Sequence, residues 1–322
     1  MSFKKSLALS LLPAADALLV PVVYPAGLIM RGIRRAGIHR MPLCRKAFRA
    51  AGVFPVRNHY YEPQFALPLL SDSTNPPRDL PGIDWNADGQ LELACQMTFG
   101  QELIDLPRDS DDDTTFRLNN YSYSSGDAEY WYQMIRLKKP RRIIEIGSGH
   151  STLMAAQAVR KNQQDDPAYR CDHVCIEPYE MPWLEKIGIT IVRKKVEDMD
   201  PHFFDQLAAD DILFIDSSHM IRPEGDVLFE YLQLLPRLPT GVIVHVHDIF
   251  SPRNYPREWL EDEVRFWNEQ YLLEAFLTEN DKWQIIGAVN WLKHNHFDLL
   301  KRIAPSLIPG HEPASFYIQR IA

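Results

Sequence analysis

The sequence predicts an α/β protein: a doubly wound, mostly parallel, seven-stranded Rossmann-like sheet with a helical and loop N-terminal extension. Two observations carry this prediction. From about residue 125, short continuous apolar runs alternate with amphipathic stretches of helical length, which is typical of parallel strands covered by helices on both faces. A glycine turn, Gly147-Ser148-Gly149, follows the first of these runs, at the end of a strand where such sheets bind ligands.

The elements are expected in a regular order. Strands are predicted over 142–146, 173–177, 189–193, 211–216 and 241–247, with two more in WQIIGAVNWL and SFYIQRI. Helices are predicted over 126–138, 151–161, 180–186, 201–208, 223–235 and 256–277. Residues 60–115 are rich in Pro and Asp and predict loops with one helix around 88–105. We therefore expect three parts: an N-terminal arm and cap over 1–115, a cofactor-binding domain over 116–295, and a C-terminal strand or tail over 296–322 that completes the sheet.

Composition excludes several classes of protein. The 322 residues are 45% apolar and 24% charged, as in an ordinary soluble globular protein. The net charge of -8 gives no reason to expect a nucleic-acid partner. Four cysteines are too few for a disulfide scaffold, so a reducing, cytoplasmic location is expected.

The N-terminus differs in character from the rest. Residues 1–60 hold ten Lys or Arg and a single acidic residue, Asp16. Residues 6–30 are apolar and long enough to span a bilayer, but Asp16 and the prolines at 13, 21 and 25 argue against a clean transmembrane helix. We expect an apolar arm packed on the body or in a homodimer interface. A membrane-surface anchor over 6–35 with its basic flank is the alternative.

The glycine turn predicts a nucleotide-like ligand. Gly147 and Gly149 allow a tight turn and a close approach of the backbone, Glu145 precedes them, and Glu177 ends the next strand, where a carboxylate can bind ribose hydroxyls. A dinucleotide fold would need a third glycine for its pyrophosphate, and position 152 is threonine. S-adenosylmethionine, which has no phosphates, fits this turn better than a nicotinamide dinucleotide. We also expect Val196 and Glu197 at the adenine.

From Gly126 to Ser151 the chain resembles class I methyltransferases, with GDA, then isoleucines and one proline, Pro140, leading to EIGSGHS. The closest resemblance is to metal-dependent small-molecule O-methyltransferases of the catechol type. The segments FIDSSHMIRPEGDVLFEYL and VIVHVHDIFSPRNYPREWL resemble a bacterial subgroup of predicted methyltransferases. The resemblance covers roughly residues 50–295.

This resemblance implies roles for individual residues. The methionine part of the cofactor would be held by Ser125, Glu145, Gly147, Gly149 and Ser151, the ribose by Glu177, and the adenine by Val196 and Glu197. Asp216 matches the metal-binding acid of the catechol type and also lies at the cofactor. His219 stands where that family has its lysine base, and the pair after the fifth strand is His247-Asp248. Asp216 and Asp248 are therefore the candidate metal ligands.

The histidines mark a departure from the family pattern. Magnesium prefers oxygen ligands, so either His247 is not a ligand, the metal is a softer ion such as Mn²⁺ or Fe²⁺, or no metal is bound. His219 is the first choice for the base that takes the proton of a hydroxyl acceptor and His247 the second, unless both are structural. Methyl transfer to a small molecule is the expected reaction. Intramolecular cyclisation of the cofactor, or binding of adenosylmethionine without catalysis, are the alternatives.

Overall fold

The structure is a computed structural model that describes residues 3–57, 61–63, 75–179 and 181–322. It divides into two compact units, Met1–Ser71 and Asp72–Ala322. Each unit is described by itself.

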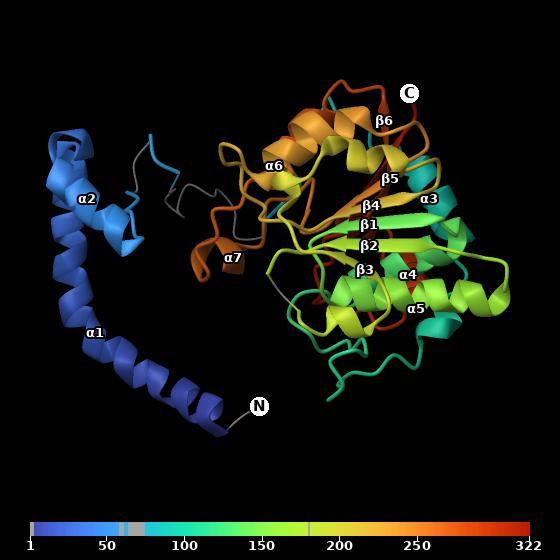
Figure 1. Ribbon diagram of the computed structural model, residues 1–322, viewed down its shortest axis with the longest axis horizontal. Coiled ribbons are helices and arrows are strands. Elements are labelled where there is room, and N and C mark those ends of the chain that lie inside the picture. The colour runs from blue at the N-terminus through green and yellow to red at the C-terminus, as the bar shows by residue number, and fades with distance from the viewer. Residues whose placement is uncertain (1–2, 58–60, 64–74, 180) are drawn as a thin grey trace. The chain divides into compact units, whose positions relative to one another are not determined.

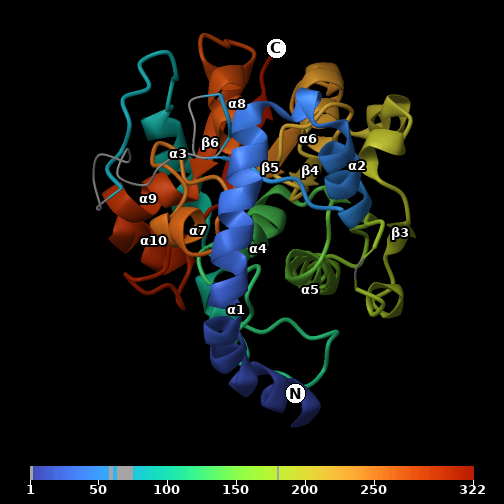
Figure 2. The same cartoon turned by 90° about the vertical axis from the view of Figure 1, so that its left-hand side faces the viewer.

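The first unit is helical. Helix α1 runs over Phe3–Ala36, a 3-10 turn covers Ile38–Arg40, and α2 covers Pro42–Ala51. The prolines counted against a transmembrane helix, Pro13, Pro21 and Pro25, all lie inside α1, which is drawn as one helix (Figure 2). Each proline removes one backbone donor, and the helix continues past it.

The second unit is built on the predicted seven-stranded sheet. Its order is β3-β2-β1-β4-β5-β7-β6 (Figure 1). The strands are β1 Arg142–Ile146, β2 Asp172–Ile176, β3 Thr190–Val192, β4 Ile212–Ile215, β5 Ile243–Val246, β6 Trp283–Ala288 and β7 Phe316–Arg320. The five strands β1 to β5 are all parallel to one another, and β7 lies antiparallel between β5 and β6. The predicted fold class, mostly parallel and Rossmann-like, is confirmed.

Helices cover both faces of this sheet (Figure 1). Ile143 on β1 packs in one apolar cluster with residues of α4 and α5, whereas its neighbour Ile144 packs in a second cluster with residues of α6 and α8. Side chains alternate between faces along a strand, so β1, β4, β5, β6 and β7 each supply residues to both clusters. The helices are α3 Ala87–Gln96, α4 Asp127–Lys138, α5 His150–Asp165, α6 Asp226–Phe229, α7 Arg257–Glu261, α8 Glu269–Leu277, α9 Val289–Asn295 and α10 Phe297–Ile303.

Several predicted helices differ from those observed. The helix expected over 256–277 is two helices, α7 and α8, separated by residues 262–268. Helices were expected over 180–186 and 201–208, but the described residues there form only short 3-10 turns, at Leu184–Lys186 and Pro201–Gln206. The helix expected over 223–235 begins at Asp226 and continues as a π-helix over Glu230–Leu234. The one expected around 88–105 ends at Gln96 and is followed by a 3-10 turn.

Candidate functional site

A cavity of about 380 Å³ opens where β1, β2 and β4 end. Gly147 follows β1, Glu177 follows β2, and Asp216 follows β4, so the parallel register brings all three residues to the same edge of the sheet. Val196 and Glu197 line the same cavity from the 3-10 turn after β3. Five of the nine predicted cofactor residues therefore border one space.

The turn at Gly147 leaves no room for a side chain. Gly147 has a φ of 80°, and a Cβ placed on it would lie 2.0 Å from the carbonyl oxygen of Asp216. Backbone hydrogen bonds hold the turn against its neighbours, from the Gly147 amide to Ile176 and from the Asp216 amide to Ile146. The cavity wall between β1 and β4 is thus bare backbone, which a ligand can approach closely.

The other four predicted cofactor residues do not line this cavity. Glu145 is fully buried beneath α5, where its carboxylate contacts the Nε2 atom of His173. It also accepts hydrogen bonds from Thr152 Oγ1 at 2.7 Å and from Ser151 Oγ at 3.4 Å. Thr152 in turn accepts a hydrogen bond from the Gly149 amide at 3.1 Å. In this structure Glu145 and Ser151 form hydrogen bonds beneath the glycine turn and do not line the cavity.

Ser125 is also turned inward. Its hydroxyl donates to Glu129 at 2.7 Å, and the amide of Gly126 donates to the same carboxylate at 3.0 Å. Asp127, the next residue, accepts hydrogen bonds from the amides of Ala314 and Ser315. These contacts fix the start of α4 against the segment before β7.

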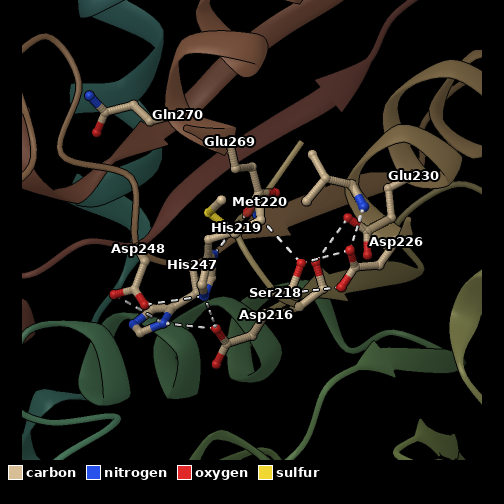
Figure 3. A network of polar contacts seen from close by, with 12 residues as sticks. Asp216, Ser218, His219, Met220, Asp226, Glu230, His247, Asp248, Glu269 and Gln270 are labelled. Carbon is tan, nitrogen blue, oxygen red and sulfur yellow. Dashed lines mark hydrogen bonds and ion pairs between the residues drawn. The ribbon is translucent and has the colours of Figure 1, made fainter. Parts of the chain in front are cut away.

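Beside the cavity, acidic groups surround two imidazoles (Figure 3). The Nε2 atom of His219 lies 3.2 Å from Asp216 and 3.4 Å from Asp248, while its Nδ1 atom lies 2.8 Å from Glu269. His247 lies 3.5 Å from Asp216 and 3.6 Å from Asp248 through Nδ1, and 3.7 Å from Asp127 through Nε2. We call these six residues the acidic cluster: Asp127, Asp216, His219, His247, Asp248 and Glu269.

Mutual attraction within the acidic cluster shifts its pKa values. Burial alone would raise the pKa of Asp216, but His247 and His219 hold it well below the ordinary carboxyl range. Burial alone would lower the pKa of each histidine. Asp216 and Glu269 nevertheless raise the pKa of His219 well above 6.5, and Asp248 and Asp216 do the same to the pKa of His247. Burial raises the pKa of Asp248 despite the two imidazoles. The carboxylates therefore favour the protonated form of both imidazoles.

Two residues of the acidic cluster have an uncommon backbone conformation. His219 has a φ of 58° and Asp248 a φ of 59°, a region that residues other than glycine seldom occupy. The amides of Asn268 and Glu269 hold the first of these bends by donating to the carbonyl of His219 at 3.0 and 3.2 Å. Backbone strain maintained by surrounding contacts is typical of functional sites.

The acidic cluster contains donors that fit a divalent cation. One ligand atom from each of Asp216, His219 and Asp248 lies within 4.8 Å of the others. Glu269 binds Nδ1 of His219 and so directs Nε2 toward the two carboxylates, an arrangement common around metal-bound histidines. Two carboxylates and an imidazole suit Mn²⁺, Fe²⁺ or Zn²⁺ better than Mg²⁺. His219 thus becomes a third candidate metal ligand beside the predicted pair Asp216 and Asp248, although the sequence predicted it as the catalytic base.

Some site residues were not predicted. Asp226, at the start of α6, lines the cavity and accepts hydrogen bonds from the amide and hydroxyl of Ser218. Glu269 orients His219 from 50 residues away, and no local pattern signals such a contact. His245 lies on β5, two residues before His247. It is fully buried and stacks on Tyr317 at 4.1 Å, but neither ring nitrogen has a hydrogen-bond partner among the described residues.

Comparisons with known proteins agree with the observed fold. Residues 144–249 match the model of the family described as Methyltransferase domain. An uncharacterized protein of Archaeoglobus fulgidus is 31% identical over 134 residues, which are 39% of this chain and 58% of that protein. The chain therefore spans little more than half the length of that relative.

Solved structures match this chain at low sequence identity. The O-methyltransferase from Bacillus cereus, solved in complex with SAH, is 12% identical with a TM-score of 0.37, and the alignment covers 73% of this chain and 91% of that one. CalS11, a TDP-rhamnose 3'-O-methyltransferase of calicheamicin biosynthesis, is 14% identical with a TM-score of 0.39, covering 75% and 99%. The family match begins inside β1 and ends just after Asp248, so the similarity includes the glycine turn, Asp216 and Asp248. It agrees with the resemblance to methyltransferases that the sequence shows from Gly126 to Ser151.

Proposed function

We propose that this chain is an S-adenosylmethionine-dependent methyltransferase that acts on a hydroxyl group of a small molecule. The observation that carries this proposal is the cavity at the strand ends, where the bare backbone of Gly147 and the carboxylates of Glu177 and Asp216 border one space. The acidic cluster lies directly beside that space because Asp216 belongs to both.

The cavity residues fit the cofactor chemically. Glu177 would bind the ribose hydroxyls, and its position is fixed by a hydrogen bond that its Oε1 atom accepts from the Tyr179 amide at 2.9 Å. Val196 would pack on the adenine ring while Glu197 accepts from its amino group. Gly149, Ser125, Glu145 and Ser151 would act on the methionine part through the backbone that they position. The cofactor supplies a methyl group on a cationic sulfonium, which the negative charge nearby favours.

The acidic cluster would hold the acceptor. Its four carboxylates outnumber its two imidazoles, so the cluster favours cations. A divalent ion held by Asp216, His219 and Asp248 would lower the pKa of an acceptor hydroxyl bound to it. The chain's own contribution is to hold that hydroxyl in line with the methyl group.

His219 remains our first proposed proton acceptor for a site without metal, and His247 the second; with an ion bound at His219, the role falls to His247. Carboxylate neighbours raise the pKa of each imidazole, which favours its protonated form, so the role requires the imidazole to lose that proton first. Cations beside an imidazole lower its pKa, and both the sulfonium and a metal ion are cations.

Calorimetric titration with S-adenosylhomocysteine tests the cofactor site. We expect binding by the unaltered protein and a loss of affinity of about tenfold or more in Glu177→Gln, since hydrogen bonds to a charged group contribute about 1.5–3 kcal/mol. Glu185→Gln is the matched control, because Glu185 pairs with Arg193 and does not line the cavity. Absence of binding, or equal affinity in Glu177→Gln, would contradict the assignment.

A further inference from the structure

Between Leu12 and Met30, helix α1 carries one charged residue, Asp16, and apolar side chains point in all directions around its axis. Its side chains from Leu12 to Ile29 include nine large apolar ones with exposed fractions between 49% and 78%: Leu12, Leu18, Leu19, Val20, Val22, Val23, Tyr24, Leu28 and Ile29. At about 100° per residue, consecutive positions such as Leu18, Leu19 and Val20 point in three different directions. A helix that lies flat on a membrane or on a partner presents one apolar face and one polar face. An apolar surface on all sides needs surroundings that are apolar on all sides.

The helix also has the length of a membrane span. Leu12–Ala36 is the one segment among the described residues that is long and apolar enough to cross a bilayer, with 25 residues and a mean hydropathy of 1.6. Its part before the first arginine, Leu12–Met30, has 19 residues and at about 1.5 Å per residue reaches roughly 28 Å, close to the roughly 30 Å of a hydrocarbon core. Prolines inside the helix do not oppose this, because they are tolerated in transmembrane helices.

A basic cavity lies where the apolar part of α1 ends. It has a volume of about 550 Å³ and is lined by Gly27, Met30, Arg31, Arg34, Arg35, Pro55, Val56 and Arg57. Glu62 pairs with Arg34 and Arg57, whereas Arg31 and Arg35 are exposed and have no ion pair within the described part of the chain. Four arginines against one carboxylate leave the cavity with a positive charge. Arginine binds phosphate oxygens through two parallel N–H groups.

We propose that α1 spans a lipid bilayer and that the arginine cavity at its end binds the phosphate of an anionic lipid headgroup. The cavity lies at the level where a headgroup would meet the helix, because Met30 and Arg31 are the last apolar and first basic residues there. Basic residues beyond the span, including those of α2, place this end on the cytoplasmic side by the positive-inside rule. The methyltransferase domain follows on that side.

Membrane flotation tests the span. Membranes from cells that express the full chain are washed with high salt, then with alkaline carbonate, and floated on a density gradient, so that aggregates sediment while inserted protein floats. We expect the unaltered chain to float after both washes and the double variant Leu18→Asp/Val22→Asp to be lost from the floating fraction. Ile321→Asp, which charges an exposed apolar residue outside α1, should float like the unaltered chain. Release of the unaltered chain by salt or carbonate, or flotation of the double variant, overturns the span.

Native mass spectrometry of the detergent-solubilised chain tests the headgroup site. We expect phosphatidylglycerol to be retained in preference to phosphatidylcholine. Arg31→Gln/Arg35→Gln should reduce that retention by about tenfold or more, because each arginine near a lipid surface adds a severalfold gain in affinity. Arg160→Gln/Arg302→Gln removes the same charge from exposed positions outside the cavity and should have no effect. Equal retention of the two lipids, equal retention by the two double variants, or displacement by inorganic phosphate at the concentration of the lipid overturns the headgroup assignment.

Discussion

Asp216 takes part in both halves of the site. Its carboxylate borders the cofactor cavity and also contacts His219 and His247. Asp248 contacts the same histidines but does not line that cavity. The two residues should therefore differ in the steps that they affect.

Substitution by the isosteric amide separates the two roles. Asp216→Asn should reduce methyl transfer by about 10²-fold or more and also weaken S-adenosylhomocysteine binding. Asp248→Asn should reduce transfer to a similar extent with its binding unchanged. Turnover and calorimetric titration measure the two effects. Tight binding by Asp216→Asn would show that its carboxylate does not contribute to the cofactor site, and full activity of Asp248→Asn would show that the acidic cluster is not the acceptor site.

Gly147→Ala should lower the free energy of unfolding by more than backbone strain alone would. Its Cβ would lie 2.0 Å from a backbone oxygen, so the turn must move. Gly188→Ala is the matched control, because Gly188 has a similar φ of 77° and nothing within 4 Å of the added carbon. The control should lose about 1–2 kcal/mol of unfolding free energy, and Gly147→Ala should lose more together with cofactor binding. Chemical denaturation compares them, and equal losses would mean that the turn tolerates a side chain.

The raised pKa values of His219 and His247 make stability depend on pH. A histidine that binds its proton more tightly in the folded state contributes stability that is present below its unfolded pKa of about 6.5 and is lost as pH rises through the folded pKa. With metal removed by a chelator, the free energy of unfolding should fall as pH rises above about 6.5. The lowered pKa of Asp216 acts at the other end, with stability lost as pH falls below about 3.8. His219→Gln should flatten the alkaline slope in urea titrations, and an unchanged slope would refute the ion pairs.

At the scale of elements, Glu145 connects β1 to the start of α5. Strand alternation puts Glu145 on the face of Ile143, toward α4 and α5, and away from the face of Ile144 and Ile146. Its hydrogen bond from Thr152, and the bond that Thr152 accepts from Gly149, tie the helix start to the strand. This direction could have been inferred from the sequence, since the periodicity of the strand determines it.

Thr152→Val tests this connection. The substitution keeps the shape of the side chain but leaves the buried carboxylate of Glu145 short of one donor, which should cost about 1–3 kcal/mol. Cofactor affinity should fall with it because Gly149 loses its partner. Thr152→Ser keeps the hydroxyl and should restore both. Thermal unfolding and calorimetry provide the two measurements, and a neutral Thr152→Val would show that the hydroxyl is dispensable.

The strands could be predicted from sequence more closely than the helices. Strands β1, β2, β4 and β5 are short apolar runs that are mostly buried, so their limits follow from local composition. The edge strand β3 is not buried. The prediction of one helix over 256–277 is wrong because Arg265 packs on the rings of both Trp259 and Trp267. Its guanidinium carbon lies 4.2 and 4.4 Å from the centres of these rings. In addition, the backbone amide of Glu269, the first residue of α8, donates a hydrogen bond to the carbonyl of His219. Contacts between distant residues override helical periodicity there, as they do at the acidic cluster, where Glu269 could not be predicted.

At the scale of the whole molecule, the two units differ in how they bury apolar residues. Both apolar clusters of the chain lie entirely within the second unit, from Ile83 to Ile318. In the first unit, α1 leaves its apolar side chains exposed. The homodimer expected from the sequence stays a prediction, since a second chain would cover the same surface that we assign to lipid.

A chain that begins at residue 75 should fold without the first unit. The second unit carries its own sheet and both apolar clusters, so its thermal midpoint should equal that of the same unit in the full chain. Circular dichroism and calorimetry on the purified fragment measure this. A lower midpoint or an insoluble fragment would mean that the first unit stabilises the methyltransferase domain.

The most direct test of the central claim is the product formed from S-adenosylmethionine. The purified chain is incubated with the cofactor and divalent metal, with and without a small-molecule extract, and the products are resolved by mass spectrometry. The proposed function predicts S-adenosylhomocysteine that accumulates only when an acceptor is present and that disappears in Asp248→Asn. Methylthioadenosine formed without any acceptor would contradict methyl transfer and indicate cyclisation of the cofactor.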